Sequence, residues 1–298
     1  MILDKEPLFD LVDNLEVSEI KCLDYGFVKL IDMMPRMVPS KTKTADAAIV
    51  QAARVSYGDG TKTPTEDRGL IRYLMRNSHS TPFEMVEFKF TMKIPIFCAR
   101  QIIRHRTANV NEISGRYSIL KDEFYIPDVE NVRKQSAVNK QCSDGSTDNL
   151  TAEDFVKYIE ELTVNSYEKY IQYMEKGVSR EQARMCLPVN LYTEFYWKID
   201  LHNLFHFLAL RCDAHCQEET RVVAQAMLDL ITPLVPMAIE AWNDYHPYRE
   251  AVKLSRLEIE CLQKALKGIK AGKIETSNSR EQNEWIQKAK KLGLVIDE

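Results

Sequence analysis

Alternation of apolar and polar residues predicts two strands, at residues 85–94 (MVEFKFTMKI) and 191–199 (LYTEFYWKI). Such a pattern is typical of an antiparallel sheet that buries one face and leaves the other in solvent. Residues 24–34 (DYGFVKLIDMM) predict a third strand with a less regular apolar face. Residues 1–23 show mixed polarity and are interpreted as a leader.

Apolar residues spaced three and four positions apart predict helices around these strands. A long amphipathic helix is expected to begin at Thr151 and Asp154 and to end at Gly177. Asp200 is expected to cap a helix whose apolar side chains point in nearly every direction, which is typical of a helix buried in the protein. The remaining expected helices are 45–55, 68–76, 95–103, 179–187, 217–231, 238–245 and two in the tail after 251.

Two segments differ in composition from the rest of the chain. Residues 131–149 are polar and are interpreted as an exposed insertion loop. Residues 251–298 are highly charged and are interpreted as a helical C-terminal extension of a main domain, residues 1–250.

Composition narrows the class of protein. The 298 residues are 45% apolar and 28% charged, as in globular proteins. The net charge of −4 argues against a nucleic-acid coat, and no apolar run is long enough for a membrane helix. Seven cysteines without a C-x-x-C pattern favour reduced thiols. We therefore expect a soluble cytoplasmic protein that binds neither membrane nor nucleic acid.

The densest polar segment is QIIRHRTANVNEISGR, residues 101–116. Its three arginines are planar donors suited to phosphate or carboxylate, and Ser114 with Gly115 allows the backbone to approach an anion closely. A solvated charged surface is the simpler alternative. Ile102 and Ile103 argue against it because they would anchor the segment to the core.

Arg184 and Arg211 stand beside strongly apolar neighbours. A buried guanidinium requires an anion, because the removal of an unpaired charge from water costs roughly several kcal/mol. The partner is either a bound ligand or an internal carboxylate, with Asp213 and Glu218 as the candidates.

Histidines and cysteines at residues 202–216 (HNLFHFLALRCDAHC) superficially suggest zinc. One straight helix cannot gather His202, His206 and His215, and no paired C-x-x-C is present, so no metal site is expected. Phosphate-loop and dinucleotide-binding glycine patterns are also absent from the sequence.

Arg104-His105-Arg106, seven residues and then Ser114 resemble the signature of the flavin-dependent thymidylate synthases. Other segments resemble that family in the same order, among them DYGFVKLID, AARVSY, HSTPFE, EFYIP, ARMCLPVNLYTEFYW and HFLALRCDAHCQEE. The resemblance covers roughly residues 24–245.

The resemblance implies an α/β fold of the α+β type, a mainly antiparallel sheet with packed helices. It implies a homotetramer with sites shared between subunits. It also implies that reduced FAD, recharged by NADPH, supplies a hydride while 5,10-methylenetetrahydrofolate supplies the carbon that converts dUMP to dTMP. No enzyme nucleophile takes part, which agrees with cysteines that lack an adjacent base.

By position, Arg211 matches the residue that activates uracil, and His79 matches the folate and nicotinamide side. Asp200 stands where the family often has asparagine, and Asn109 where serine is common. The residues that match dUMP contacts are Gln101, Ile102, Ile103, Arg104, Glu112, Ile113, Ser114, Gly115, Arg116, Arg184 and Arg211. Those that match FAD contacts are Ser56, Thr81, Arg104, His105, Arg106, Asn111, Glu112, Asp200 and His206.

A nucleotide- or RNA-binding module that uses the Arg104–Arg106 loop on phosphates is the alternative from another class. It predicts steeply salt-dependent binding to oligonucleotides, which the near-neutral charge balance disfavours.

Overall fold

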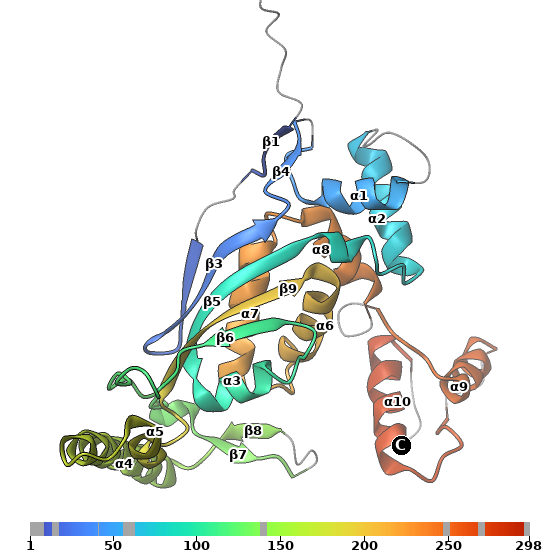
Figure 1. Ribbon diagram of the computed structural model, residues 1–298. Coiled ribbons are helices and arrows are strands. Elements are labelled where there is room, and N and C mark those ends of the chain that lie inside the picture. The colour runs from blue at the N-terminus through green and yellow to red at the C-terminus, as the bar shows by residue number, and fades with distance from the viewer. Residues whose placement is uncertain are drawn as a thin grey trace, which may run out of the picture. The chain divides into compact units, whose positions relative to one another are not determined.

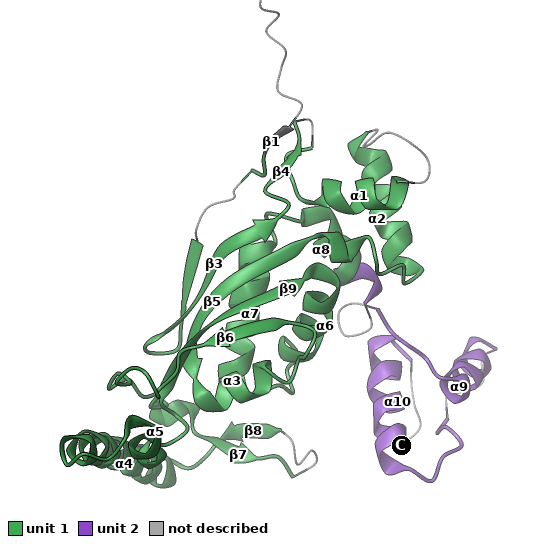
Figure 2. Ribbon diagram, in the orientation of Figure 1, with its two compact units in different colours: residues 1–242 green, residues 243–298 purple. Residues whose placement is uncertain are grey.

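The computed structural model describes residues 9–13, 18–40, 42–55, 63–137, 142–246, 251–267 and 272–294. The chain divides into two compact units, residues 1–242 and 243–298 (Figure 2). The separation of a main domain, 1–250, from an extension, 251–298, stays a prediction. None of the helices in the described ranges is both long and apolar enough to cross a bilayer.

A five-stranded antiparallel sheet forms the centre of the first unit (Figure 1). Its order is β2-β3-β5-β9-β6, so that β5 and β9, which carry the regular alternation, lie in the middle. Every pairing within it is antiparallel, which confirms the expected fold class. The strands are β2 (Ser18–Cys22), β3 (Gly26–Met34), β5 (Glu87–Pro95), β6 (Asn109–Glu112) and β9 (Tyr192–Asp200).

Two small antiparallel sheets stand apart from it. One joins β1 (Phe9–Leu11) to β4 (Met37–Pro39), and the other is a hairpin of β7 (Arg133–Gln135) and β8 (Ser143–Ser146). The described residues of the segment 131–149 are mostly exposed as expected, but they include a hairpin and the start of a helix rather than only loop.

Helices α6 and α7 lie along one face of the sheet (Figure 1), where α7 contacts β2 and β3 while α6 contacts β9. The helices of this unit are α1 (Asp46–Arg54), α2 (Pro64–Arg76), α3 (Ile96–Ile102), α4 (Asn149–Glu175), α5 (Arg180–Ala183), α6 (Leu201–Arg211), α7 (Glu218–Ile231) and α8 (Pro236–Tyr245, which ends in the second unit). Three short 3-10 turns are η1 (Phe83–Met85), η2 (Val129–Asn131) and η3 (Arg184–Cys186).

The core lies between the sheet and these helices. Trp197 from β9 packs on Phe207 from α6, with ring centroids 5.0 Å apart, and Phe205 stacks on Trp242 at 5.0 Å. All four side chains are buried, so α6 is fixed from both sides. Burial of aromatic rings of this size is the main source of stability in such a core.

The second unit has a small core of its own. Trp285 and Ala289 from α10 (Ser279–Lys291) pack with Cys261 from α9 (Arg256–Leu266) and with Ile274. Lys288 donates to the buried carboxylate of Glu258 at 2.9 and 3.1 Å.

Several expectations were wrong in detail. The interpretation of residues 1–23 as a leader is wrong for the described part, because β1 and β2 form there by pairing with later strands. Helix α4 begins at Asn149, two residues early, because the Asp148 side chain accepts from Thr151 N at 3.0 Å and caps it. Helix α6 is capped by Asp200 as expected, but His202 and His206 on one side are exposed.

Candidate active site

An open cleft of about 1060 Å³ lies where the end of α3 and the turn that follows it face α6. Positions 203, 206 and 210 of α6 fall on one helical face because they are three and four residues apart. The cleft is lined by Arg100, Gln101, Arg104, His105, Arg106, Thr107, Asn203, His206, Leu210 and Arg211. Six of these ten are residues that the sequence had singled out.

The Arg211 guanidinium is held from two sides within the cleft. Its Nε donates to Nε2 of His105 at 3.2 Å, and its Nη2 donates to the carbonyl oxygen of Gln101 at 3.2 Å. A guanidinium has five N–H donors, so donors remain for a ligand. The expected burial of this side chain is only partial.

His105 is a neutral hydrogen-bond acceptor in this arrangement. Its ring meets Phe207 edge-on at 4.9 Å and His206 at 6.1 Å. Burial, the charge of Arg211 and His206 together lower the pKa of His105 to about 4. The ring is therefore uncharged near neutral pH, with its proton on Nδ1 because Nε2 accepts from Arg211.

Arg104 and Arg106 project from the turn after α3 and are exposed. In the ranges that the structure describes, neither side chain makes an ion pair or hydrogen bond with another residue. Their charge is thus available to an anion in the cleft, and guanidinium groups bind phosphate oxygens in pairs.

A second group of arginines surrounds Gly115. Arg116 Nε lies 3.3 Å from a carboxylate oxygen of Glu181, and Arg184 Nε donates to the Glu181 carbonyl at 3.4 Å. A Cβ at residue 115 would lie 2.9 Å from Leu120 Cδ1 and 3.3 Å from Arg184 Cδ. Glycine thus lets Arg184 approach the backbone closely, while Arg184 itself is exposed rather than buried as expected.

Glu112 connects the exposed edge strand β6 to the interior of the sheet. The buried Thr193 hydroxyl on β9 donates to Glu112 Oε1 at 2.5 Å. Sequence reasoning missed Thr193, because only strand pairing reveals which residue lies beside the carboxylate.

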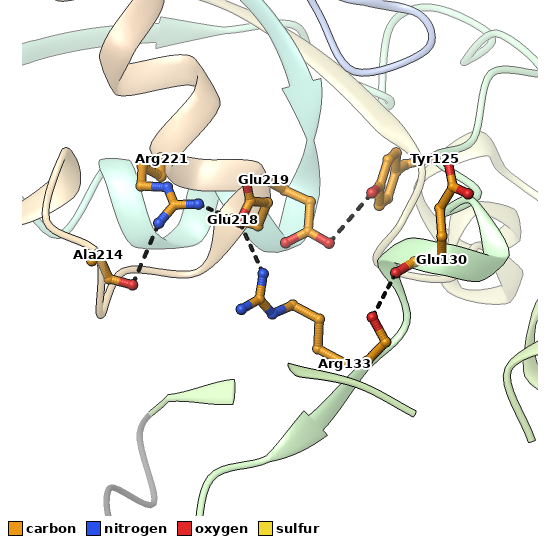
Figure 3. A network of polar contacts seen from close by, with 8 residues as sticks. Tyr125, Glu130, Arg133, Ala214, Glu218, Glu219 and Arg221 are labelled. Atoms are coloured by element: carbon orange, nitrogen blue, oxygen red, sulfur yellow. Dashed lines mark hydrogen bonds and ion pairs between the residues drawn. The ribbon is translucent and has the colours of Figure 1, made fainter. Parts of the chain in front are cut away.

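The candidate carboxylate partners of Arg184 and Arg211 are engaged elsewhere. Figure 3 shows Glu218 bonded to Arg221 and also to Arg133, whose Nη1 is 3.1 Å away. Asp213 accepts from the His215 ring at 2.7 Å. Of the two alternatives for the arginines, the internal ion pairs with Asp213 or Glu218 are not observed, because Arg133 from the hairpin and two local side chains occupy both carboxylates.

A comparison with family models decides the classification of the chain. Residues 37–237 match the family described as "Thymidylate synthase complementing protein". The chain belongs to that family, the flavin-dependent thymidylate synthases. The resemblance seen in the sequence, and the enzyme class that it implied, are confirmed.

Two flavin-dependent thymidylate synthases from other organisms match this chain over most of the length of both partners. A flavin-dependent thymidylate synthase of Dictyostelium discoideum is 51% identical over 284 residues, covering 95% of this chain and 90% of its own. One from Thermus thermophilus is 53% identical over 244 residues, covering 82% of this chain and 84% of its own.

A solved structure supports the fold of the same family. The UMP/dUMP methylase PolB from Streptomyces cacaoi, bound with 5-Br dUMP, superposes with a TM-score of 0.66 at 32% identity. The match covers 76% of this chain and 98% of PolB.

The positions that match dUMP contacts in the thymidylate synthase family fall into separate places in this chain. Gln101, Arg104 and Arg211 line the cleft, whereas Gly115, Arg116 and Arg184 form the second group, and none of these three is a lining residue. The side chain of Ile102 is buried in the core, while Ile103 is 41% exposed and does not anchor the turn as expected.

The positions that match FAD contacts are also divided. Arg104, His105, Arg106 and His206 line the cleft, and Asn111 and Glu112 lie on β6. Both carboxylate oxygens of Asp200 bond Asn203, at 2.9 and 2.6 Å, so that Asn203 rather than Asp200 lines the cleft. Thr81 is not a lining residue, and Ser56 lies outside the described residues.

His79, matched to the folate and nicotinamide side, packs edge-on against Tyr73 at 5.7 Å. Across the part of the chain that is described, no three metal-binding side chains come together. His206 faces His105 and His215 bonds Asp213, so these histidines do not converge on a common point.

Proposed function

We propose that this chain converts dUMP to dTMP with FAD, NADPH and 5,10-methylenetetrahydrofolate. The observation that carries the proposal is the cleft in which Arg104, Arg106 and Arg211 face a common space without a carboxylate partner among the described residues. Three guanidinium groups around one open cleft are suited to phosphorylated ligands. Membership of the flavin-dependent thymidylate synthase family favours a nucleotide and a flavin as these ligands.

In this proposal dUMP is held by the two arginine groups together. Gln101, Arg104 and Arg211 act from the cleft, while Ser114, Gly115, Arg116 and Arg184 act from the second group. Ile102, Ile103, Glu112 and Ile113 complete the set of positions proposed for dUMP. Glu181, bonded to both Arg116 and Arg184, orients the second group.

FAD fits the chemistry of the cleft. The unpaired guanidinium groups of Arg104 and Arg106 suit its pyrophosphate, and the rings of His105 and His206 can pack against an aromatic ligand. When bound, the flavin supplies the hydride. Thr81, Asn111, Glu112, Asp200 and Ser56 are the further positions proposed for FAD, and His79 is proposed for the folate and NADPH side.

Arg211 is the proposed catalytic residue. A guanidinium keeps its positive charge while the uracil ring develops negative charge, and a fixed charge of opposite sign stabilises that state. The bonds to His105 and Gln101 hold the fork in place before the ligand arrives. A proton-bearing His105 would compete with this role, and the low pKa of His105 prevents it.

We further propose that the site is completed in a cytoplasmic homotetramer. The support is apolar exposure next to the site: Val110 and Ile113 are 50% and 46% exposed, and Tyr117 is 75% exposed. Exposed apolar side chains beside the outer edge of a sheet are typical of an interface. Light scattering of the purified protein tests the assembly, and a monomer at micromolar concentration contradicts it.

The activity is tested with purified protein incubated with FAD, NADPH, methylenetetrahydrofolate and dUMP. Flavin absorbance that bleaches on addition of NADPH, followed by dTMP on chromatography, is the expected result. Protein that neither retains nor takes up FAD, or that forms no dTMP when loaded with FAD, contradicts the proposal. Arg36→Ala serves as the control, because Arg36 pairs with Asp32 on an exposed part of the sheet and should not affect turnover.

A further inference from the structure

The side chain of Gln217 bonds a residue of the cleft without lining the cleft itself. Gln101 Nε2 donates to Gln217 Oε1 at 2.5 Å, although the two residues are 116 positions apart. Gln101 lines the cleft, whereas Gln217 does not. It lines a separate cavity of about 490 Å³ between the hairpin and the start of α7.

Gln217 occupies a helix position that usually serves another purpose. It is the N-cap residue of α7, where short polar side chains such as serine or aspartate bond the first free amides of the helix. Its side chain makes no such bond. Its backbone carbonyl accepts from Thr220 N and Arg221 N at 3.1 and 2.9 Å, so the helix starts without help from the side chain.

Gln101 in turn connects Gln217 to Arg211. Its carbonyl oxygen accepts from Arg211 Nη2 at 3.2 Å while its side-chain amide is held by Gln217. A free glutamine side chain samples several rotamers and both amide orientations, and ordering it costs conformational entropy when a ligand binds. A bond made before binding removes part of that cost.

We propose that Gln217 is a positioning residue for dUMP, which fixes the amide of Gln101 in the orientation that contacts the nucleotide. This inference rests on the proposed function, in which Gln101 binds dUMP. Gln217 touches neither substrate nor flavin, and it acts only through Gln101.

The test compares steady-state kinetics of the FAD-loaded enzyme and of Gln217→Met, which keeps the length of the side chain and removes the acceptor. A neutral hydrogen bond contributes about 0.5–1.5 kcal/mol, so the KM for dUMP should rise about twofold to tenfold, with a smaller change in kcat. The melting temperature should change little, because the bond that is lost lies at the surface and no helix-cap bond is lost. Gln225→Met is the matched control on the same helix, since Gln225 is exposed and bonds the neighbouring Asp229 at 2.8 Å.

The Gln101→Met background separates positioning from a structural role. If Gln217 acts through Gln101, adding Gln217→Met to Gln101→Met produces no further rise in the KM for dUMP. An unchanged KM in the single Gln217→Met variant, or an equal rise in both backgrounds, overturns the inference. Failure of the wild-type enzyme to convert dUMP overturns the proposed function instead, so the two failures are distinguishable.

Discussion

Arg211 donates its Nε–H to Nε2 of His105 across 3.2 Å, and this bond requires a neutral histidine. A protonated imidazolium has no lone pair on Nε2 and could not accept the bond. The pair therefore carries one positive charge rather than two.

His105 should titrate with a pKa well below the ordinary range of a histidine. In the wild-type protein its ring should take up no proton between pH 8 and pH 5.5, because burial, Arg211 and His206 lower its pKa to about 4. In Arg211→Gln the positive neighbour is gone, so the midpoint should move upward. Histidine NMR signals, assigned with His105→Gln, measure both midpoints, and a wild-type midpoint near 6.5 would show that the bond is absent.

The depressed pKa also affects stability. Between pH 6.5 and about 4 the unfolded chain binds a proton at His105 that the folded protein does not. The contribution of His105 is thus fully present above pH 6.5 and is lost as the pH falls through this window. Urea unfolding of wild type and His105→Gln should show the wild type losing more free energy of unfolding from pH 7 to pH 4.5.

Asp46 should give the free energy of unfolding the opposite pH dependence. It is 2% exposed and accepts from the backbone amides of Met237 and Ala238 at 2.9 and 3.0 Å. Burial raises its pKa to about 6, so its ionisation lowers stability as the pH rises from 4 to 6. Asp46→Asn should remove this slope, and Asp46→Ala should cost about 1–3 kcal/mol because two amides lose their acceptor. Urea unfolding at pH 4 and pH 7 checks both variants, and parallel curves for wild type and Asp46→Asn would contradict the assignment.

Gly115→Ala should weaken nucleotide binding without unfolding the protein. The added methyl group would lie 2.9 Å from Leu120 Cδ1 and 3.3 Å from Arg184 Cδ, and both are parts of flexible side chains that can move. We expect a displaced Arg184 and a rise of about tenfold in the Kd for dUMP, comparable to the loss of one charged hydrogen bond. Calorimetric titration with dUMP measures this, and an unchanged Kd with an intact fold would exclude a role for this close approach.

Thr193→Val should affect ligand binding through Glu112. The substitution keeps the shape of the side chain and removes the hydroxyl that donates to Glu112 Oε1 at 2.5 Å. The Kd for FAD or dUMP should rise about threefold to tenfold, because the carboxylate loses the bond that orients it. Thr193→Ser retains the hydroxyl and should bind both ligands like the wild type, so equal behaviour of the Val and Ser variants would refute this role of the bond.

Much of the fold was predictable because its central strands carry strong patterns. In β5, Phe88, Phe90, Met92 and Ile94 alternate with polar residues and all four are buried, and β9 repeats the pattern. The edge strand β6 was not predicted. Its sequence NVNE has no alternation, and its four exposed residues become a strand only by pairing with β9.

The site was predictable in part for a similar physical reason. Arg104, His105, Arg106 and Arg211 are recognisable by type and sequence motif, and all four line the cleft. Gln217, Glu181 and Thr193 are ordinary polar residues whose contacts depend on which elements pack together. No local pattern reveals such contacts, and for the same reason the sequence could not decide whether Asp213 or Glu218 pairs with Arg184 or Arg211.

The sharing of Glu218 between two arginines has an evolutionary consequence. Arg133 belongs to the β7–β8 hairpin and Arg221 to α7, so the surface hairpin is tethered to the helix that begins right after Gln217. We expect a homologue that changes the length or the charge of this hairpin to shift the start of α7. Through Gln217 and Gln101, that shift should change the affinity for the substrate. Natural variation far from the chemistry would then be visible as differences in substrate affinity between species.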